Sequence, residues 1–297
     1  TIPPWRSVGE VDGSCRRRPN PEPAQSSRNA GYSPSVTTTN GNLPEVVSRE
    51  EWMVARRALL AQEKELTRTR DEVNASRRRL PMVRVDKPYE FDGPSGTLGL
   101  ADLFEGRQQL VMHHFMFDPA WEDACASCSS AADGISGLRQ LHVRNTTLVA
   151  VSRAPYPKLA AIRQRMGWTF PWYSSSGSDF NYDFHATLDD RIAPVLLHFR
   201  DESELADVGT PWTQGPWIES MRGAEMPGIS VFLRVGEEVF HTYSTFGRGI
   251  EEFHNGYPYL DLTALGRQEE WEKPAGRADP LGLQVGGPNL RLPDAYG

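Results

Sequence analysis

The sequence is 297 residues long, with 38% hydrophobic residues, 24% charged residues and a formal net charge of −7. The acidic balance argues against a general nucleic-acid or anionic-membrane binder, because such proteins need excess Lys and Arg to displace counterions. The chain has no run of about 18 apolar residues, which a membrane-spanning helix needs. Its three cysteines are too few for a disulfide-stabilised secreted scaffold. We therefore expect a soluble, cytoplasmic protein whose partners are neither nucleic acids nor membranes.

Residues 1–47 are predicted to form a disordered, low-complexity segment. They are rich in Pro, Ser, Gly, Asn and Thr, so they bury too little apolar surface to offset the loss of conformational entropy on folding. One of the three cysteines, Cys15, lies in this segment beside three arginines. We interpret it as an incidental thiol.

A long amphipathic helical arm is predicted over residues 48–81. Ser48 and Glu51 have the spacing of a capping box, and Pro81 ends the helix because proline lacks the N–H that a helix interior needs. An apolar residue recurs at every seventh position, which places one stripe along the helix: Trp52, Leu59, Leu66, Val73 and Leu80. The arm either lies against its own domain or mediates a homodimer, and its length and charge favour the homodimer.

Residues 82–267 are predicted to form one α/β domain. Apolar runs predict strands over residues 110–117, 146–151, 229–234 and 239–244, and apolar periodicity predicts helices over residues 125–141, 157–167 and 248–254. The order strand, helix, strand, helix, hairpin, helix predicts a thioredoxin-like fold, in which helices flank a central mixed sheet. Residues 175–225 show no regular pattern, and residues 268–297 are predicted to be a loose Gly- and Pro-rich tail.

The most informative motif is a pair of cysteines, Cys125 and Cys128, placed where the first strand ends and a helix begins. At a helix start, unpaired N–H groups and the helix dipole stabilise negative charge, so the pKa of the first thiol should fall. We predict a thiol–disulfide oxidoreductase in which Cys125 is the nucleophile and Cys128 the resolving thiol. Pro227, which leads the third strand, would shape the substrate groove. The substrate would be a protein or small-molecule thiol or disulfide, and no cofactor is needed.

Copper binding is the alternative function for the same cysteines. A single C-x-x-C unit excludes a four-cysteine zinc site within one chain. Copper(I), however, suits two thiolates with an imidazole. His241 on the last strand is expected beside the helix that carries the cysteines, and His114 lies on the first strand. A copper-binding protein or copper-dependent enzyme with Cys125, Cys128, His241 and His114 as ligands therefore stays open.

Several strings of the sequence together are similar to one bacterial family. They are Val47–Trp52, His114–Phe117, Cys125–Ser129, Val151–Pro155, Met166–Trp168, Ser178–Phe184 and Phe240–Ser244. They resemble the thioredoxin-like family known as domain of unknown function 899, whose members are described as predicted dithiol–disulfide oxidoreductases. The resemblance covers about residues 47–265, and it implies a thioredoxin-like fold with the two cysteines as the redox pair.

Side chains within the resembling strings are expected to contact the substrate or to support the cysteines. These are His114, Arg153, His241 and Tyr243. The chain departs from the family pattern at His113, where an aromatic residue is usual, and at Ala126, where proline is common. These departures leave room for a specialised role.

Overall fold

The computed structural model describes residues 43–208, 219, 221–253, 256–273, 279–284 and 287–296. The predictions for the first segment and for Cys15 fall almost wholly on residues 1–42, and therefore lie outside the described residues. Within the described part of the chain, no helix combines the length and the apolar character needed to cross a membrane.

The predicted helical arm is present as helix α1, Arg49–Arg77. The capping box at its start is confirmed. The Glu51 N–H donates to Ser48 Oγ over 3.2 Å, and the Ser48 N–H donates to Glu51 Oε2 over 2.9 Å. These two bonds satisfy backbone donors that a helix start otherwise leaves unpaired. The helix ends at Arg77, before Pro81.

The apolar stripe of α1 is not covered by the rest of the described chain. The five residues of the stripe, from Trp52 to Leu80 just past the end of α1, are between 44% and 61% exposed, and no residue of α1 is buried. The contacts of this helix with the domain include the Arg70–Glu252 ion pair and the stacking of Arg77 on Tyr243. An apolar stripe of this length is typical of a helix that packs on another chain.

We expect the protein to be a homodimer that pairs through α1. The double variant Leu59→Glu with Leu66→Glu places charges in the stripe, so the particle mass measured by light scattering should fall to that of a single chain. The matched control is Ala61→Glu, because residue 61 lies on the opposite side of the helix from Leu59. A mass that does not change in the double variant would exclude α1 as the dimer interface.

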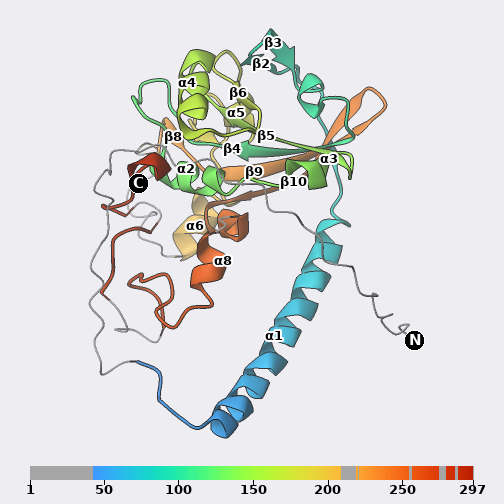
Figure 1. Ribbon diagram of the computed structural model, residues 1–297. Helices are drawn as coiled ribbons and strands as arrows, with labels where there is room; N and C mark the ends of the chain where they lie inside the picture. The colour runs from blue at the N-terminus through green and yellow to red at the C-terminus, as the bar shows by residue number, and fades with distance from the viewer. Residues whose placement is uncertain are drawn as a thin grey trace, which may run out of the picture. The chain divides into compact units, whose positions relative to one another are not determined.

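The domain is built on an eight-stranded mixed sheet with the strand order β1-β10-β9-β4-β5-β6-β2-β3 (Figure 1). The strands are β1 Val83–Arg84, β2 Glu90–Gly93, β3 Gly96–Gly99, β4 Gln109–His114, β5 Thr146–Ser152, β6 Trp172–Ser174, β9 Gly228–Val235 and β10 Glu238–Phe246. The two-residue strands β7, Thr187–Leu188, and β8, Ala224–Glu225, form a separate small sheet.

The centre of the large sheet confirms the thioredoxin-like fold. Strand β4 is parallel to β5 on one side and antiparallel to β9 on the other, and β10 continues the hairpin from β9. Two short helices, α2, Ala126–Asp133, and α3, Leu138–His142, connect β4 to β5. Helix α4, Tyr156–Met166, connects β5 to β6, and Gly167 ends it at a φ of 69°. The predicted order of elements therefore folds into the predicted sheet.

The predicted helix over residues 125–141 is wrong in its length. The structure contains α2, Ala126–Asp133, and α3, Leu138–His142. Gly134 caps the first helix, and Gly137 has a φ of 68°, a conformation that glycine adopts without steric cost. The chain therefore breaks between two helices where one was expected.

Residues 175–225, which lack a sequence pattern, contain short elements in addition to β7 and β8. These are α5, Phe180–Asp183, and α6, Glu202–Val208. The remaining short elements of the chain are η2, Asp102–Phe104, η4, Gly247–Phe253, α8, Gly256–Leu260, and η5, Pro293–Ala295. The helix expected over residues 248–254 is thus the 3-10 helix η4.

Alternation along the central strands divides the core into two clusters. On β4, Leu110 and Met112 pack with Val149, Val151 and Phe232 on one face. The opposite face carries a cluster that includes Cys128 and Ala132 of α2 and Trp172 of β6. Side chains of successive strand residues point to opposite faces, so each strand residue belongs to one cluster only.

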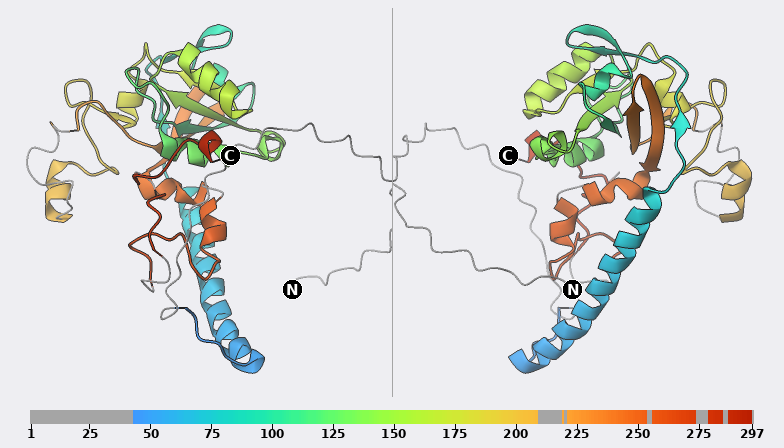
Figure 2. Two further views of the ribbon diagram at one scale, coloured as in Figure 1. Left: turned by 60° about the vertical axis from the view of Figure 1, so that its left-hand side comes forward. Right: turned by 90° about the vertical axis from the view of Figure 1, so that its right-hand side faces the viewer.

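The C-terminal residues fold back onto α2. Helix η5 contacts α2, and Figures 1 and 2 show the red C-terminal turn beside the green α2. Arg165 of α4 pairs with Asp294 over 3.2 Å. The segment predicted to be a loose tail therefore makes specific contacts next to the helix that carries the cysteines.

Candidate functional site

The start of α2 positions the two cysteines. Cys125 is the N-cap residue, and its carbonyl oxygen accepts bonds from the N–H and the hydroxyl of Ser129, both over 2.9 Å. The Cys125 N–H donates to the carbonyl of Met116, over 3.2 Å, in the chain that follows β4. These bonds fix the first turn of the helix, so that the sulfur of Cys125 faces the N–H groups of Ser127 and Cys128.

The two thiols have opposite electrostatic environments. A hydrogen bond donated by the Cys128 thiol lowers the pKa of Cys125 from 9.0 to about 6, against burial and with the help of the Cys128 and Ser127 N–H groups. Burial raises the pKa of Cys128 well above its ordinary value, and the hydrogen bond to Cys125 and the negative charges of Cys125 and Glu225 raise it further. Cys125 is partly exposed and Cys128 is 2% exposed. The pair is thus an accessible thiolate beside a buried thiol.

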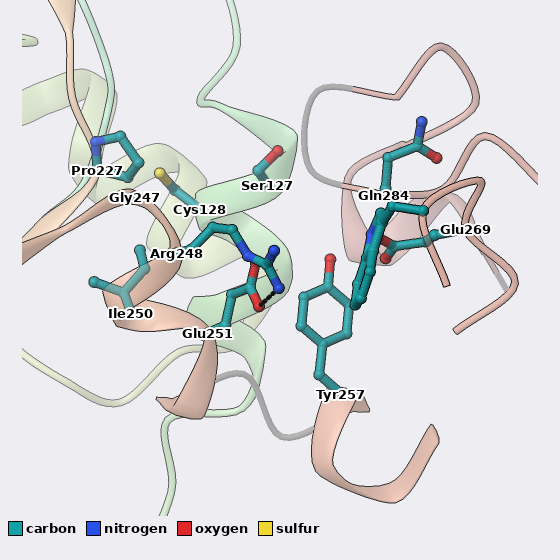
Figure 3. A pocket seen from close by; sticks show the side chains of 11 residues that line it. Ser127, Cys128, Pro227, Gly247, Arg248, Ile250, Glu251, Tyr257, Glu269 and Gln284 are labelled. Carbon is teal, nitrogen blue, oxygen red and sulfur yellow. Dashed lines mark hydrogen bonds and ion pairs between the residues drawn. The ribbon is translucent and has the colours of Figure 1, made fainter. Parts of the chain in front are cut away.

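A cavity of about 340 Å³ opens beside Cys128 and Pro227 (Figure 3). Pro227, which was predicted to shape the substrate groove, lines this cavity together with Cys128, whereas Cys125 is not among the lining residues. The far wall comes from C-terminal residues, among them Tyr257, Trp271 and Gln284. Sequence reasoning missed this wall, although a tryptophan in a segment rich in Gly and Pro is a signal of packing.

Arg153, one of the predicted supporting residues, ties the two parts of the site together. Its guanidinium donates to Glu225 Oε1 over 2.6 Å, to the hydroxyl of Tyr182 over 2.8 Å and to the carboxylate of Asp118. Asp118 lies in the segment between β4 and the cysteines, whereas Glu225 ends β8, two residues before Pro227. Burial raises the pKa of Glu225, and the charge of Arg153 opposes that rise.

Arg153→Ala should destabilise the fold by about 3–5 kcal/mol, because it leaves the buried Glu225 carboxylate without its cation. The free energy of unfolding from urea titration measures this loss. Arg139→Ala, at an exposed arginine of α3, is the control and should change the unfolding free energy by less than about 0.5 kcal/mol. Equal stabilities of the two variants would show that the Arg153 network does not hold the site together.

The predicted copper ligands are not brought together. His114 lies on the sheet face opposite the cysteines, where its ring stacks on Phe180 and Phe246. Its Nε2 bonds Ser230 Oγ over 2.7 Å, and Ser230 bonds Ser244, which in turn bonds His241 Nε2. His241 is therefore part of the same polar chain.

The expectation that His241 lies beside the cysteine-bearing helix is wrong. The reason is the parity of the strands: His114 follows Leu110 and Met112 at intervals of two, and His241 pairs with Phe232 of the same core cluster. The described residues contain no group of three His, Cys, Asp or Glu side chains able to hold a metal ion. The four-ligand copper site is thus not formed.

Burial governs the chemistry of the two histidines. Burial lowers the pKa of His114 to about 3, and it also lowers the pKa of His241. Both rings are therefore neutral members of a hydrogen-bonded core, with no contact to the cysteines. Tyr243, the other residue predicted to support the site, is not among the residues that line the cavity beside Cys128, and Arg77 of α1 stacks on its ring at 5.4 Å.

A family model described as a bacterial protein of unknown function (DUF899) matches residues 41–295. The chain belongs to this family. The match includes α1, the whole sheet and the C-terminal residues that line the cavity. These parts are therefore features of the family's architecture, and the resemblance noted in the sequence is confirmed.

Solved structures offer a distant likeness. A PrxQ mutant of Xylella fastidiosa is 15% identical with a TM-score of 0.36, over 59% of this chain and 89% of that chain. The bacterioferritin comigratory protein of Xanthomonas campestris is 10% identical with a TM-score of 0.35, over 54% and 80%. Peroxidoxin BcpB of Mycobacterium tuberculosis is 14% identical with a TM-score of 0.33, over 56% and 80%. No curated protein sequence matches the chain. Likeness at this level carries no argument about function, which has to come from the residues of this chain.

Proposed function

We propose that the protein is a thiol–disulfide oxidoreductase, with Cys125 as the nucleophile and Cys128 as the resolving thiol. The observation that carries the proposal is the asymmetry of the pair. A partly exposed sulfur with a pKa of about 6 accepts a hydrogen bond from a buried thiol on the same helical turn. At neutral pH such a sulfur is a thiolate, which is the attacking form in disulfide exchange.

The proposed reaction has two exchange steps. The Cys125 thiolate attacks one sulfur of the substrate, the substrate S–S bond breaks, and one half leaves as a thiolate that takes a proton from water. Cys128 then loses its proton, and its thiolate attacks the Cys125 sulfur and releases the second half as a thiol. Two electrons pass from the cysteine pair to the substrate, and the pair becomes a disulfide.

The residues around the pair favour attack by Cys125 first and resolution by Cys128 second. The high pKa of Cys128 keeps it protonated while Cys125 attacks, so the two sulfurs do not both ionise at rest. Pro227 lies beside Cys128 in the cavity wall and contributes no backbone N–H there. Arg153 joins the segment before Cys125 to the strand before Pro227, through its ion pairs with Asp118 and Glu225.

A turnover assay tests the proposal. The reduced protein is mixed with a disulfide substrate and dithiothreitol, which returns the oxidised pair to the dithiol form. We expect the disulfide to be reduced faster than by dithiothreitol alone, both for insulin and for small disulfides. A rate equal to that of the reductant alone, with every disulfide tried, would overturn the proposed function.

A further inference from the structure

Two apolar cavities adjoin along one side of α2. The first is the cavity of about 340 Å³ beside Cys128, and the second, of about 450 Å³, lies under the other end of the helix. Cys128 of α2 lines the first cavity, and Ala131 of α2 and Ile135, two residues past the end of this helix, line the second. Ile250 of η4 lines both cavities, so the two meet at its side chain.

Ser136 and Gln140 line the second cavity, but most of its wall is made of apolar side chains. They come from the sheet and from the α2–α3 region: Val111, Ala131, Ile135, Leu141, Leu148 and Ile229. His113 of β4 supplies an imidazole, and it is on the same sheet face as α2 because it alternates with His114. A cavity with these walls favours the hydrocarbon or aromatic part of a ligand.

The charged groups around the first cavity are paired with one another. Arg248 donates to both carboxylate oxygens of Glu251, over 3.0 and 3.3 Å, and lies over the ring of Trp271 at 4.8 Å. The Trp271 indole N–H donates to Glu269 over 2.5 Å, and Arg267 pairs with Glu251 over 3.1 Å. Each guanidinium among these already pairs with a carboxylate, so the network carries no excess positive charge and favours a neutral ligand over an anionic one.

The side chains of the far wall face the thiol side across the cavity. Figure 3 shows Tyr257 and Gln284 opposite Cys128 and Pro227, with the guanidinium of Arg248 between them. Arg267 stacks on Tyr257 at 4.3 Å and also pairs with Asp261, which holds this wall in place. The buried Oε1 of Gln284 has no hydrogen-bond partner within the described part of the chain, so it can accept a bond from a ligand.

We infer that the dithiol acts on a small, neutral disulfide with an apolar body, held in these two cavities along α2. The inference rests on the proposed function and names its substrate class. Volumes of 340 and 450 Å³ fall within the range of small-molecule sites, about 300–1,000 Å³. Cys128 borders the first cavity, and the nucleophile Cys125 lies three residues before it at the start of α2, so the S–S bond lies at this end and the apolar body extends toward Ile250.

The test compares two disulfides that differ in their bodies. Dibenzyl disulfide is neutral and apolar, and oxidised glutathione is charged and polar. Each kcat/KM is divided by the rate constant of uncatalysed reduction by dithiothreitol, which removes the intrinsic reactivity of the substrate. We expect this normalised ratio to favour dibenzyl disulfide by at least about tenfold.

Two variants test whether each cavity contributes to the preference for dibenzyl disulfide. Trp271→Ala removes part of the first cavity's wall, and Ile135→Trp fills the second cavity from a position seven residues beyond Cys128. Each should lower the preference for dibenzyl disulfide by about tenfold. Val235→Ala is the control, since it shortens a half-exposed apolar side chain at the end of β9 that lines neither cavity. Circular dichroism of each variant checks its folding.

A second measurement separates this inference from the proposed function. N-phenyl-1-naphthylamine, a neutral apolar fluorophore, should bind the wild-type protein and bind Trp271→Ala at least about fivefold more weakly. Equal normalised rates for the two disulfides, with probe binding unaffected by Trp271→Ala, would overturn the substrate class and leave the redox function standing. Probe binding that depends on Trp271, without reduction of any disulfide, would overturn the redox function and keep the apolar site.

Discussion

Cys125→Ser should abolish disulfide reduction, with a loss in kcat/KM on the order of 10³-fold or more. A serine hydroxyl is not ionised at neutral pH and cannot form the mixed disulfide, so both exchange steps are lost. The measurement is reduction of a disulfide substrate by the variant, in the presence of dithiothreitol and with the uncatalysed rate subtracted.

The other two cysteines supply controls for this experiment. Cys128→Ser keeps the nucleophile and removes the resolving thiol, so it should accumulate a mixed disulfide at Cys125 that intact-protein mass spectrometry detects. Cys15→Ser removes the cysteine that lies outside the pair and should retain full activity. Retention of activity in Cys125→Ser would show that the mechanism is wrong.

Alkylation of Cys125 should follow a titration with its midpoint near pH 6. Iodoacetamide reacts with the thiolate, whose fraction rises as the pH increases through the pKa, so the rate should rise between about pH 5 and 7 and then level off. At pH 7 a thiol of pKa 6 is about nine-tenths ionised, whereas one of pKa 9 is about one-hundredth ionised. The site of modification is read by peptide mass spectrometry.

The cause of the low pKa can be tested at Cys128. Since the hydrogen bond from Cys128 is the largest cause, Cys128→Ala should move the midpoint of alkylation to higher pH. Cys128→Ser retains a hydroxyl that can donate, and should move the midpoint less. A wild-type midpoint near pH 9, or one that Cys128→Ala leaves in place, would contradict the electrostatic account of the pair.

The parts of the site that form between residues close in the chain could be predicted from the sequence. The two cysteines come directly after a buried strand and start a helix, and both features depend on short-range signals that the sequence contains. The capping box at Ser48 is local in the same sense, because its two hydrogen bonds join residues three apart. Gly134 and Gly137 are local in the same sense, because Gly134 caps α2 and Gly137 adopts a positive φ just before α3.

Whether a histidine lies on the same sheet face as α2 depends on how the strands assemble into the sheet. Alternation places His113 and His114 on opposite faces, but the sequence does not say which face α2 covers, because that depends on the side of β4 on which β5 is added. The choice of His114 as a neighbour of the cysteines was therefore wrong, and His113 is the one on the face of α2. His241 was misplaced for the same reason.

The sequence alone determined the helix α1, the order of the central strands and helices, and the cysteine pair at the start of α2. These depend on hydrogen bonds and apolar periods between residues close in the chain. The tertiary structure alone decided that Glu225 meets Arg153 and that Trp271 lines the same cavity as Cys128. These pairs are 72 and 143 positions apart in the sequence, and they come together only when burial of the core brings distant segments of the chain together.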